Sequence, residues 1–476
     1  MCVRAIERIL VGQMRLCVLV CIFSVSCYAV HAVEAPADNL RLSLKDAVSR
    51  SLTKNPDIKQ METERLNSIS NLSIANIRTL ATAGVDTFIS GTTGEMGTTG
   101  LIFGHGEYNA LSGMDAKLDF APVAFGADRA SLGLEVGIPL TKGRGKLSPQ
   151  WNTLEDAKSY LTIQNYETYL RRQKTVYLVV QSYMFVLLAQ EETKVQEKSL
   201  EIARAVAEGA RKRAAADLVT FNEVSRADVN VAKAEDELNR KRIDTKAAVD
   251  DLLIAIGERI ETNVELTDIV PEKEYVSPDS IKAVSIALEN RLELKQYDQQ
   301  LVDKHRQLAL SKDQLRNSLD IVAGYRSTNF GSSIFSDSLL NSDSARIGLQ
   351  YGVILDKRDL REKTKINQRQ LDLLADLRVY EADRIASEVR DACRAVDAEG
   401  ASLRILSLNL QTARDFLKIS QRLVEEGLAS NREILDAQEA LRQVAIGILS
   451  AKVSLYLAEI RLKLAMGEDL LETVKK

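Results

Sequence analysis

The chain has 476 residues, of which 45% are hydrophobic and 27% are charged, and its formal net charge is −4. Charge this dense argues against a bundle of membrane-spanning helices, each of which needs about 20 consecutive apolar residues. The small acidic excess gives no reason to expect a nucleic-acid partner. The seven prolines leave two long stretches without proline, Gln150–Val270 and Asp279–Lys476, so both stretches can form long helices.

The N-terminus has the pattern of an export signal. Arg15 precedes an apolar run from Leu16 to Val25, and Val30–Ala32 offers a cleavage site between small residues. We therefore expect residues 1–32 to be a signal peptide and the mature protein to be exported. An alternative is a lipoprotein, in which Cys27 would carry the lipid.

The rest of the chain is a duplication. The segment 423–440, LVEEGLASNREILDAQEA, reads as a helix end, a tight turn and a new helix start. The segment 217–228, DLVTFNEVSRAD, matches it at an offset of 210 residues. Near the start of each half the offset is 236 residues, because SRSLTKNPDIKQ (49–60) aligns with SIALENRLELKQ (285–296).

The two offsets differ by 26 residues, so the first half is longer by that amount. The surplus is expected in the glycine-rich stretch 91–126, which we interpret as a cell-surface loop. The first structural repeat is expected to span residues 33–270 and the second 271–476. Their hairpin turns are expected at about 217–221 and 426–431.

Each half is expected to begin with a helix, roughly 44–81 in the first and 278–317 in the second, followed by a strand pair. Residues 132–140 and 347–355 alternate between apolar and other side chains with a period of two. The apolar face has the length of a tilted transmembrane strand, although an ordinary half-buried hairpin gives the same local pattern. Strands are expected at 85–90, 132–140, 320–328 and 347–355.

Long helices are expected after the strands, from Leu154 to about Ala214 and from Arg361 to Glu426, and each turn is followed by a shorter helix. A heptad of large residues opposite alanines predicts close, left-handed packing of these helices. Lys241 and Thr245 interrupt the heptad in the first half, and Cys393 is expected to be a small buried residue on a helix. The first-half heptad begins with Val224, Ala227, Val231, Ala234 and Leu238.

A sheet of four strands from one chain would have unpaired edges in lipid, where unsatisfied backbone groups are very unfavourable. Several copies that close one barrel would remove these edges. The strand number alone allows two, three or four copies.

These segments together resemble the TolC-like outer-membrane efflux family over roughly Leu42–Leu470. The resemblance is carried by LSLKDAVSRSLTKNPDI at the start, GLEVGIPL at a strand, EEGLASNREILDAQ at the turn, and the duplicated endings LLIAIGE and LKLAMGE. It implies a mostly α-helical homotrimer, in which duplicated helical hairpins form a periplasmic α-barrel. It also implies four strands per chain in a twelve-stranded outer-membrane β-barrel.

The resemblance implies a function as well. Such a protein is the passive exit duct of a tripartite efflux pump or a type I secretion system. It lies in the outer membrane of a Gram-negative bacterium, extends into the periplasm, and works with a periplasmic adapter protein and an inner-membrane transporter. The alternative is a soluble periplasmic coiled-coil scaffold or adapter without a barrel.

In this family the two hairpin turns form the periplasmic mouth, which is closed at rest and contacts the adapter. Asp217 stands where the second turn has Gly427, so the two turns are expected to differ. The residues implied in adapter contact are Asp217, Leu218, Val219 and Thr220 in the first turn, and Gly427, Leu428, Ala429 and Ser430 in the second.

Glu433 and Asp436 occupy the positions of two inward-facing aspartates that narrow the mouth in the family's best-known member. Side chains three residues apart on a helix can face the same lumen, and rings of carboxylates favour cations. The alternative is that Glu433 completes a capping box with Ser430 and Asp436 is an ordinary solvated residue. The expected partners for resting-state locks between helices are Glu223, Arg226 and Arg432.

The sequence has no recognisable catalytic set. The glycine-rich stretch 94–106 is not followed by the Lys-Ser/Thr pair of a phosphate-binding loop. The three histidines, His31, His105 and His305, are scattered and do not have the spacing of metal ligands. We therefore expect no enzyme, no cofactor and no metal site.

Overall fold

The structure is a computed structural model that describes residues 40–77, 82–91, 98–121, 130–216, 220–272, 275–330, 343–426, 428 and 431–475. The expected signal peptide and Cys27 lie outside these residues. The chain separates into two compact units. In the described part of the smaller unit, the Leu40 N–H donates to the Asn263 carbonyl at 2.8 Å, and Arg41 pairs with Glu265 at 3.2 Å.

The two halves of the chain contribute similar series of elements. Those of the first half are β1 (Leu40–Leu42), α2 (Leu44–Lys54), α3 (Pro56–Ile77), β2 (Thr82–Gly91), β3 (Thr98–Asn109), β4 (Asp115–Ala121), β5 (Ala130–Pro139), the short 3₁₀ helix η1 (Gly145–Leu147), α4 (Pro149–Ala215) and α5 (Phe221–Ile256). Those of the second half are β6 (Val264–Leu266), α6 (Ser280–Asn290), α7 (Leu292–Gln314), β7 (Ser318–Phe330), β8 (Asp343–Gly352), α8 (Arg358–Glu425), α9 (Asn431–Ala465) and α10 (Leu470–Lys475).

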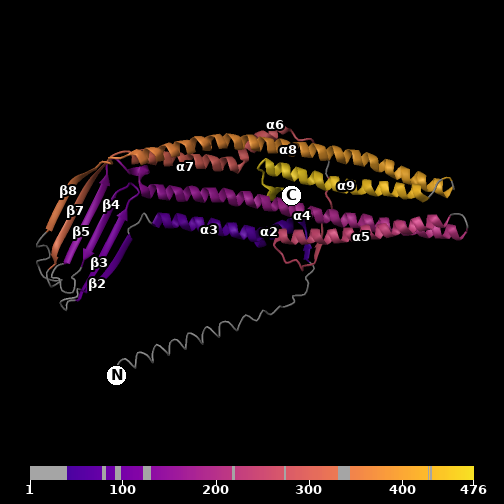
Figure 1. Cartoon of the computed structure of the whole chain (residues 1–476), viewed down its shortest axis with the longest axis horizontal. Coiled ribbons are helices and arrows are strands. Elements are labelled where there is room, and N and C mark those ends of the chain that lie inside the picture. The colour runs from indigo at the N-terminus through magenta and orange to yellow at the C-terminus, as the bar shows by residue number, and fades with distance from the viewer. Residues whose placement is uncertain are drawn as a thin grey trace, which may run out of the picture. The chain divides into compact units, whose positions relative to one another are not determined.

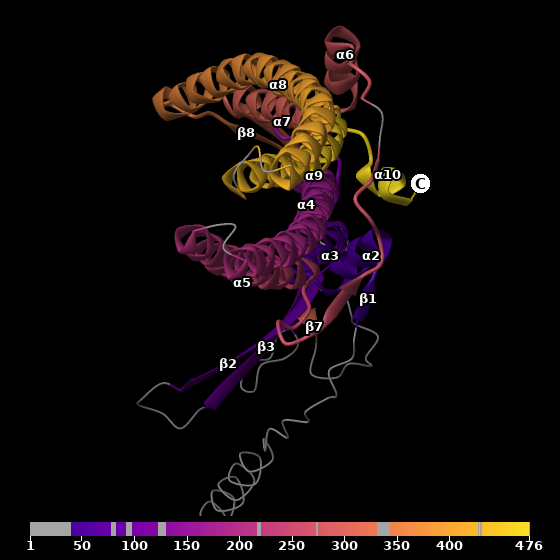
Figure 2. The same ribbon diagram turned by 90° about the vertical axis from the view of Figure 1, so that its right-hand side faces the viewer.

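Within the larger unit, the long helices α4 and α8 have 67 and 68 residues, which corresponds to about 100 Å each at the α-helical rise. Helix α4 begins at Pro149 rather than at the expected Leu154, because proline suits the first helical turn and Ser148 caps it through the Trp151 N–H. Helices α5 and α9 run back along α4 and α8. The sheet lies at the end of the long helices that is opposite the two hairpin turns (Figure 1). Viewed along their axes, these four helices curve around one open side (Figure 2).

The helix expected at 44–81 is broken into α2 and α3, and its counterpart is broken into α6 and α7. The break at Asn55 follows from Pro56, which disfavours the helical conformation of the residue before it. The second break is at Arg291, which is followed by Leu292 and not by proline, yet it has nearly the same backbone angles (φ −61°, ψ 121°). Packing from elsewhere in the chain must therefore maintain this second break.

That packing comes from the glycines that end α5 and α9. Gly257 and Gly467 adopt left-handed conformations with φ of 81° and 74°, and each begins a turn in which the next N–H bonds back five residues. A Cβ on Gly257 would lie 2.9 Å from the Asn55 backbone, and a Cβ on Gly467 would lie 3.3 Å from the Arg291 nitrogen. The duplicated endings LLIAIGE and LKLAMGE thus fit against the two helix breaks.

The breaks are also held by side chains. The Asn55 amide donates to the Ala255 carbonyl at 2.9 Å. Near this break, the Glu258 carboxylate accepts hydrogen bonds from Lys54 and Arg50. Burial alone would raise the pKa of Glu258, but these two cations outweigh burial and hold the pKa below its ordinary value.

The sheet of the larger unit contains six antiparallel strands in the order β2-β3-β4-β5-β7-β8, so the prediction of four strands per chain is wrong. The expected cell-surface loop at 91–126 contains β3 and β4, which form an additional hairpin. The two halves meet where β5 pairs with β7, with Leu134 opposite Tyr325. The glycine content of 91–126 concealed these strands, because glycine is uncommon in strand interiors.

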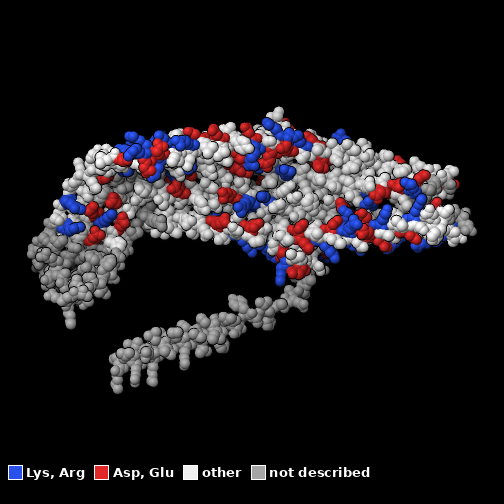
Figure 3. Space-filling model, viewed as in Figure 1, with Lys and Arg blue, Asp and Glu red and all other residues white. Residues whose placement is uncertain are grey.

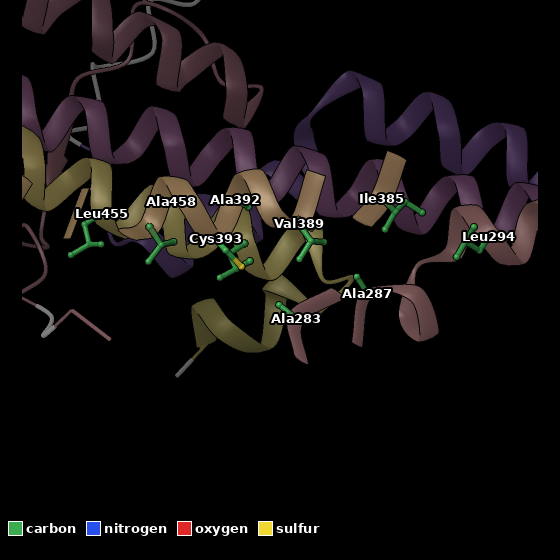
Figure 4. Close-up of a cluster of buried hydrophobic side chains, with 12 residues drawn as sticks. Ala283, Ala287, Leu294, Ile385, Val389, Ala392, Cys393, Leu455 and Ala458 are labelled. Carbon is green, nitrogen blue, oxygen red and sulfur yellow. The ribbon is translucent and has the colours of Figure 1, made fainter. Parts of the chain in front are cut away.

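The apolar core lies where the helices pack. Ala283 and Ala287 on α6 lie against Ile385, Val389 and Cys393 on α8, and their small side chains allow close approach (Figure 4). Cys393 is 3% exposed, so its expected buried position is confirmed.

The expected heptad seam joins α4 and α5. Its buried clusters are Leu200 and Ala203 against Ala234 and Leu238, and Ala207 and Ala210 against Val224 and Ala227. The two polar interruptions have partners on α4: the Thr245 hydroxyl lies 3.0 Å from that of Thr193, and Lys241 pairs with Glu192 at 2.7 Å. Charged side chains of both signs are interspersed over the helix surface seen in Figure 3.

Candidate functional site

The turn between α4 and α5 is the first of two candidate contact points. Asp217, Leu218 and Val219 lie outside the described residues. Thr220 occupies the N-cap position of α5, is exposed, and makes no side-chain capping hydrogen bond. Phe221, the first residue of α5, is 82% exposed. This exposed aromatic side chain at the start of α5 was not among the residues predicted from the sequence.

The turn between α8 and α9 has a similar exposed apolar residue. Leu428 is 73% exposed, and its N–H donates to the Leu423 carbonyl at 2.8 Å. The bond runs from an N–H to the carbonyl five residues earlier, a pattern that is typical of the C-terminal end of a helix. Gly427, Ala429 and Ser430 lie outside the described residues, so the proposed capping box is not described either.

The carboxylates expected at the mouth lie on the first two turns of α9. Glu433 and Asp436 are both exposed. Arg432 lies 3.7 Å from Asp436 within the same helix, and both side chains are largely exposed. Arg432 therefore pairs within its own helix in this chain, and its role in a lock between helices stays a prediction. An exposed pair of this kind adds about 0.3–0.5 kcal/mol at most and leaves the carboxylate hydrated.

Other residues tie the helices together. Glu223 is half-buried and Arg226 is exposed, and their expected role in a lock stays a prediction. The ion pairs that join α4 to α5 were not expected from the sequence. They are Arg211 with Asp228, Arg204 with Glu235, Arg242 with Glu197 and Lys241 with Glu192. Opposite charges beside the heptad seam were the signal that could have revealed them.

Helix α4 of the first hairpin packs against α9 of the second, and a side-chain hydrogen bond joins them. Arg442 on α9 donates to the Gln196 side-chain oxygen on α4 at 3.3 Å. Gln196 is buried, and its amide also donates to the Ala234 carbonyl. Arg442 also donates a hydrogen bond to the Glu439 carboxylate at 2.6 Å, which raises the pKa of Arg442, so the guanidinium stays charged. This contact is the structure's candidate for a lock between the hairpins.

The sheet has two chemically different faces. On one face Leu118, Leu134 and Ile138 are exposed, and on β8 Ile347 and Leu349 are 84% and 71% exposed. A row of apolar side chains open to the surroundings is typical of strands that face lipid.

The opposite face carries charges. Glu135 on β5, Gly324 on β7 and Arg346 on β8 lie side by side in the register, and Arg346 reaches Glu135 at 2.5 Å across the glycine. A Cβ on Gly324 would meet the Arg346 side chain at 2.8 Å, so the glycine makes room for this contact. The next row of paired residues on this charged face contains Asp119 on β4 and Arg326 on β7. An apolar face and a charged face on the same strands are what a barrel between lipid and water requires.

The comparisons with known proteins agree with this geometry. The family model described as "Outer membrane efflux protein" matches residues 283–468. The match covers the greater part of the second half of the chain and makes that segment similar to the outer membrane efflux protein family. The match confirms the expected resemblance and the expected outer-membrane location. A search of curated proteins found no match.

Solved structures extend the likeness in fold to nearly the whole chain. A structure described as CusC, in a study of transmembrane channel formation, has 15% identity and a TM-score of 0.69 over 90% of this chain and 92% of its own. VceC, an outer membrane protein from Vibrio cholerae, has 16% identity and a TM-score of 0.68 over 89% and 96%. The Campylobacter jejuni CmeC outer membrane channel has 15% identity and a TM-score of 0.67 over 91% and 88%. The fold is therefore that of outer-membrane channels.

The described residues contain no group of three or more His, Cys, Asp or Glu side chains that could hold a metal ion. The family and the solved relatives are efflux and channel proteins.

Proposed function

We propose that the protein is a passive exit duct in the outer membrane. Its sheet would stand in lipid, its helical hairpins would reach into the periplasm, and an inner-membrane transporter would supply the energy. The observation that carries this proposal is the two-faced sheet at one end of the helices, with the exposed Phe221 and Leu428 at the other end. Those two side chains would contact a periplasmic adapter protein.

A single chain leaves apolar surface that a neighbour would cover. Helix α8 exposes Leu373, Leu377 and Tyr380, and helix α3 exposes Leu66 and Ile74. The spacing of each set follows one helical face, so each helix has an unpartnered apolar stripe. A homotrimer would pair these stripes between neighbouring copies and close the sheets into one barrel, which removes edges in lipid.

The duct would serve a tripartite efflux pump or a type I secretion system. Selection of cargo would then lie with the transporter and the adapter, because the described hairpins present generic solvated charges. Its mouth would carry rings of Glu433 and Asp436, which attract cations and resist tight closure because like charges repel. Opening would move the hairpins apart and release the contact between Arg442 and Gln196.

Planar-bilayer recordings of the purified protein test the mouth. Replacing Glu433 and Asp436 together by alanine should raise the single-channel conductance and weaken block by divalent cations added on the periplasmic side. The matched control is a double replacement of Asp372 and Asp376, which are exposed near the sheet end of α8. Equal conductance and equal block in the mouth variant and the wild type would remove these two carboxylates from the gate.

Membrane fractionation distinguishes the duct from a soluble scaffold. A duct should appear in the outer-membrane fraction and remain trimeric in mild detergent. Recovery in the soluble periplasmic extract, with no conductance in bilayers, would favour the coiled-coil scaffold.

A further inference from the structure

A pocket of about 460 Å³ opens where the end of α9 meets the start of α7. A volume of this size is typical of small-molecule sites. Four helices form the walls, so both halves of the chain contribute to them. We call it the join pocket and define it by residues on each helix: Lys174 and Leu178 on α4, Leu292 on α7, Arg384 on α8 and Arg461 on α9.

Part of the charge around the join pocket is neutralised within the chain. Arg291, which is 7% exposed, donates to Glu388 on α8 at 2.6 Å and lies 3.4 Å from Glu293 on α7. Arg384 donates hydrogen bonds to Glu381 from two of its nitrogens, and these bonds raise the pKa of Arg384, so it stays charged. Both carboxylates that α7 and α8 contribute to the pocket are therefore engaged by Arg291.

Three cations of the join pocket have no such partner. Arg171, Lys174 and Arg461 are exposed, and within the described part of the chain none of them forms an ion pair. Arg171 and Lys174 are three residues apart on α4, so their side chains lie on one face of the helix. Among the described carboxylates that line the pocket, Glu468 alone is not engaged by Arg291. The excess of positive charge favours an anionic ligand.

The other walls of the join pocket are largely apolar. They are formed by Tyr169, Tyr177, Leu178, Leu292 and Leu464. Leu178 is 45% exposed, so a ligand that covered it would remove apolar surface from water. A pocket with apolar walls and a few convergent charges suits a ligand that has an apolar body and charged groups. The chemistry of the join pocket therefore fits an amphipathic organic anion.

The cations on α4 lie toward the open side of the curved helices. The Gln173 side-chain oxygen accepts a hydrogen bond from the Leu470 N–H of α10 at 2.9 Å, and Figure 2 shows α10 on the outer side of the curve. At about 100° per residue, Arg171 and Leu178 project from α4 roughly opposite to Gln173. They therefore face the open side, which in a duct is the side of the lumen.

We propose that the join pocket binds amphipathic organic anions and that such anions are cargo of the duct. This inference rests on the proposed function and names a class of cargo for it. The transporter and the adapter would still select what enters. Exposed cations bind an anion only moderately, which suits a site that cargo must leave again.

The acidic mouth does not neutralise this pocket. Glu433 is in the first turn of α9, whereas Arg461 is near the other end of the helix, about 40 Å away at the α-helical rise. This separation is several times the screening length of about 8 Å at physiological ionic strength. The cations of the join pocket therefore act on an anion independently of the mouth.

A hydroxypyrene trisulfonate dye and the full-length protein in lipid nanodiscs test this inference. The dye has a flat apolar body and three sulfonates, whose charge keeps it out of the lipid. Its fluorescence anisotropy should rise on binding, and the affinity should fall as the salt concentration rises. The combined variant Arg171→Gln, Lys174→Gln and Arg461→Gln should bind the dye about tenfold more weakly.

A matched control removes three other cations. Lys198, Lys233 and Lys246 are exposed and form no ion pair in the described part of the chain. Their combined replacement by glutamine changes the net charge by the same amount and should leave the dye affinity at the wild-type value.

A second pair of variants tests the position of the ligand. Leu178→Glu adds a carboxylate to the join pocket and should weaken dye binding about tenfold. Phe185→Glu is its control, because Phe185 is also 45% exposed and lies on the same face of α4 two turns further on, outside the pocket. Dye binding by Phe185→Glu should match the wild type. Both sites are exposed, so neither change should prevent folding.

Equal dye affinity in the wild type and the combined glutamine variant, or equal loss in Leu178→Glu and Phe185→Glu, would overturn the inference, and conductance in bilayers would then leave the exit duct intact. Competition by inorganic phosphate as effective as competition by unlabelled naphthalene sulfonates would overturn the amphipathic ligand, because charge alone would then determine binding. Dye binding without any conductance would instead overturn the proposed function, and with it the role of the anion as cargo.

Discussion

Alanine at the glycines that end α5 and α9 should destabilise the protein to different extents. Both positions have positive φ, so alanine costs about 1–2 kcal/mol at either one for the left-handed conformation. At Gly257 the added Cβ would also meet three backbone atoms of Lys54 and Asn55 at 2.9 Å. Backbone atoms cannot swing aside as a flexible side chain can, so overpacking adds about 1–3 kcal/mol there.

At Gly467 the nearest atoms lie at 3.3 Å, which requires a shift of only a few tenths of an ångström. We therefore expect Gly257→Ala to lower the free energy of unfolding by about 2–5 kcal/mol and Gly467→Ala by about 1–2 kcal/mol. Gly209→Ala is the matched control. Gly209 lies inside α4 with nothing closer than the Arg213 side chain at 4.0 Å, so alanine should stabilise the protein by about 0.5–1 kcal/mol.

Thermal unfolding in detergent, followed by the helical circular dichroism signal, gives the order of the midpoints. The expected order is Gly209→Ala above wild type, wild type above Gly467→Ala, and Gly257→Ala lowest. A Gly257→Ala midpoint equal to that of Gly467→Ala would refute the close approach of α5 to the α2–α3 break. If Gly257→Ala and Gly467→Ala both unfolded at the wild-type midpoint, the left-handed conformations of these two glycines would be refuted as well.

Three further results are expected. Arg442→Leu removes the contact with Gln196 on the other hairpin and should increase the open probability in bilayers, whereas an unchanged gating record would exclude this lock. Glu258 has a lowered pKa, so its contribution to stability is present above the ordinary glutamate pKa of about 4.3 and is lost as the pH falls below it. In the Glu258→Gln variant the unfolding midpoint should therefore change less with pH in that range than it does in the wild type. Tyr183→Phe removes a buried hydrogen bond to a carboxylate at 2.9 Å and should lower the free energy of unfolding by about 1–3 kcal/mol, while Tyr160→Phe, at an exposed site, should leave it unchanged.

The helices were the most predictable part of this protein from its sequence. Proline-free stretches and the heptad of Val224 and Leu238 opposite alanines are local patterns, and the structure places both in a packed helical hairpin. The break at Asn55 was also readable, since Pro56 follows it. The break at Arg291 was not readable, because it depends on the approach of Gly467 from a distant part of the chain.

The sheet was less predictable, for a different reason. The strand β5 was expected because it alternates apolar residues with glycine, proline and Glu135 over nearly ten residues. The alternation in β4 covers only Asp115–Ala121 and lies within a glycine-rich segment, so it reads as a loop until its neighbours are known. Hydrogen bonds to β3 and β5, rather than local propensity, decide its conformation.

The candidate site shows the same division. The position of Glu433 and Asp436 at the start of α9 followed from the turn motif. The partner of Arg432 could not be predicted from the turn motif. An exposed arginine can pair with any carboxylate within reach, and Arg432 lies nearest to Asp436 on its own helix. The contact between Arg442 and Gln196 depends on how two hairpins meet, which no local pattern records.

The contacts within and between hairpins point to how an opening motion would proceed. Four ion pairs and a heptad seam join α4 to α5, so separating these two helices would break many contacts at once. At the described contact between α4 and α9, by comparison, Arg442 meets Gln196 in a single hydrogen bond of 3.3 Å. A motion that moves each hairpin as one body would keep the ion pairs between α4 and α5, and it would break this hydrogen bond together with the packing of α4 against α9. Because Glu433 and Asp436 belong to α9, such a motion would also carry their charges away from the axis of the mouth.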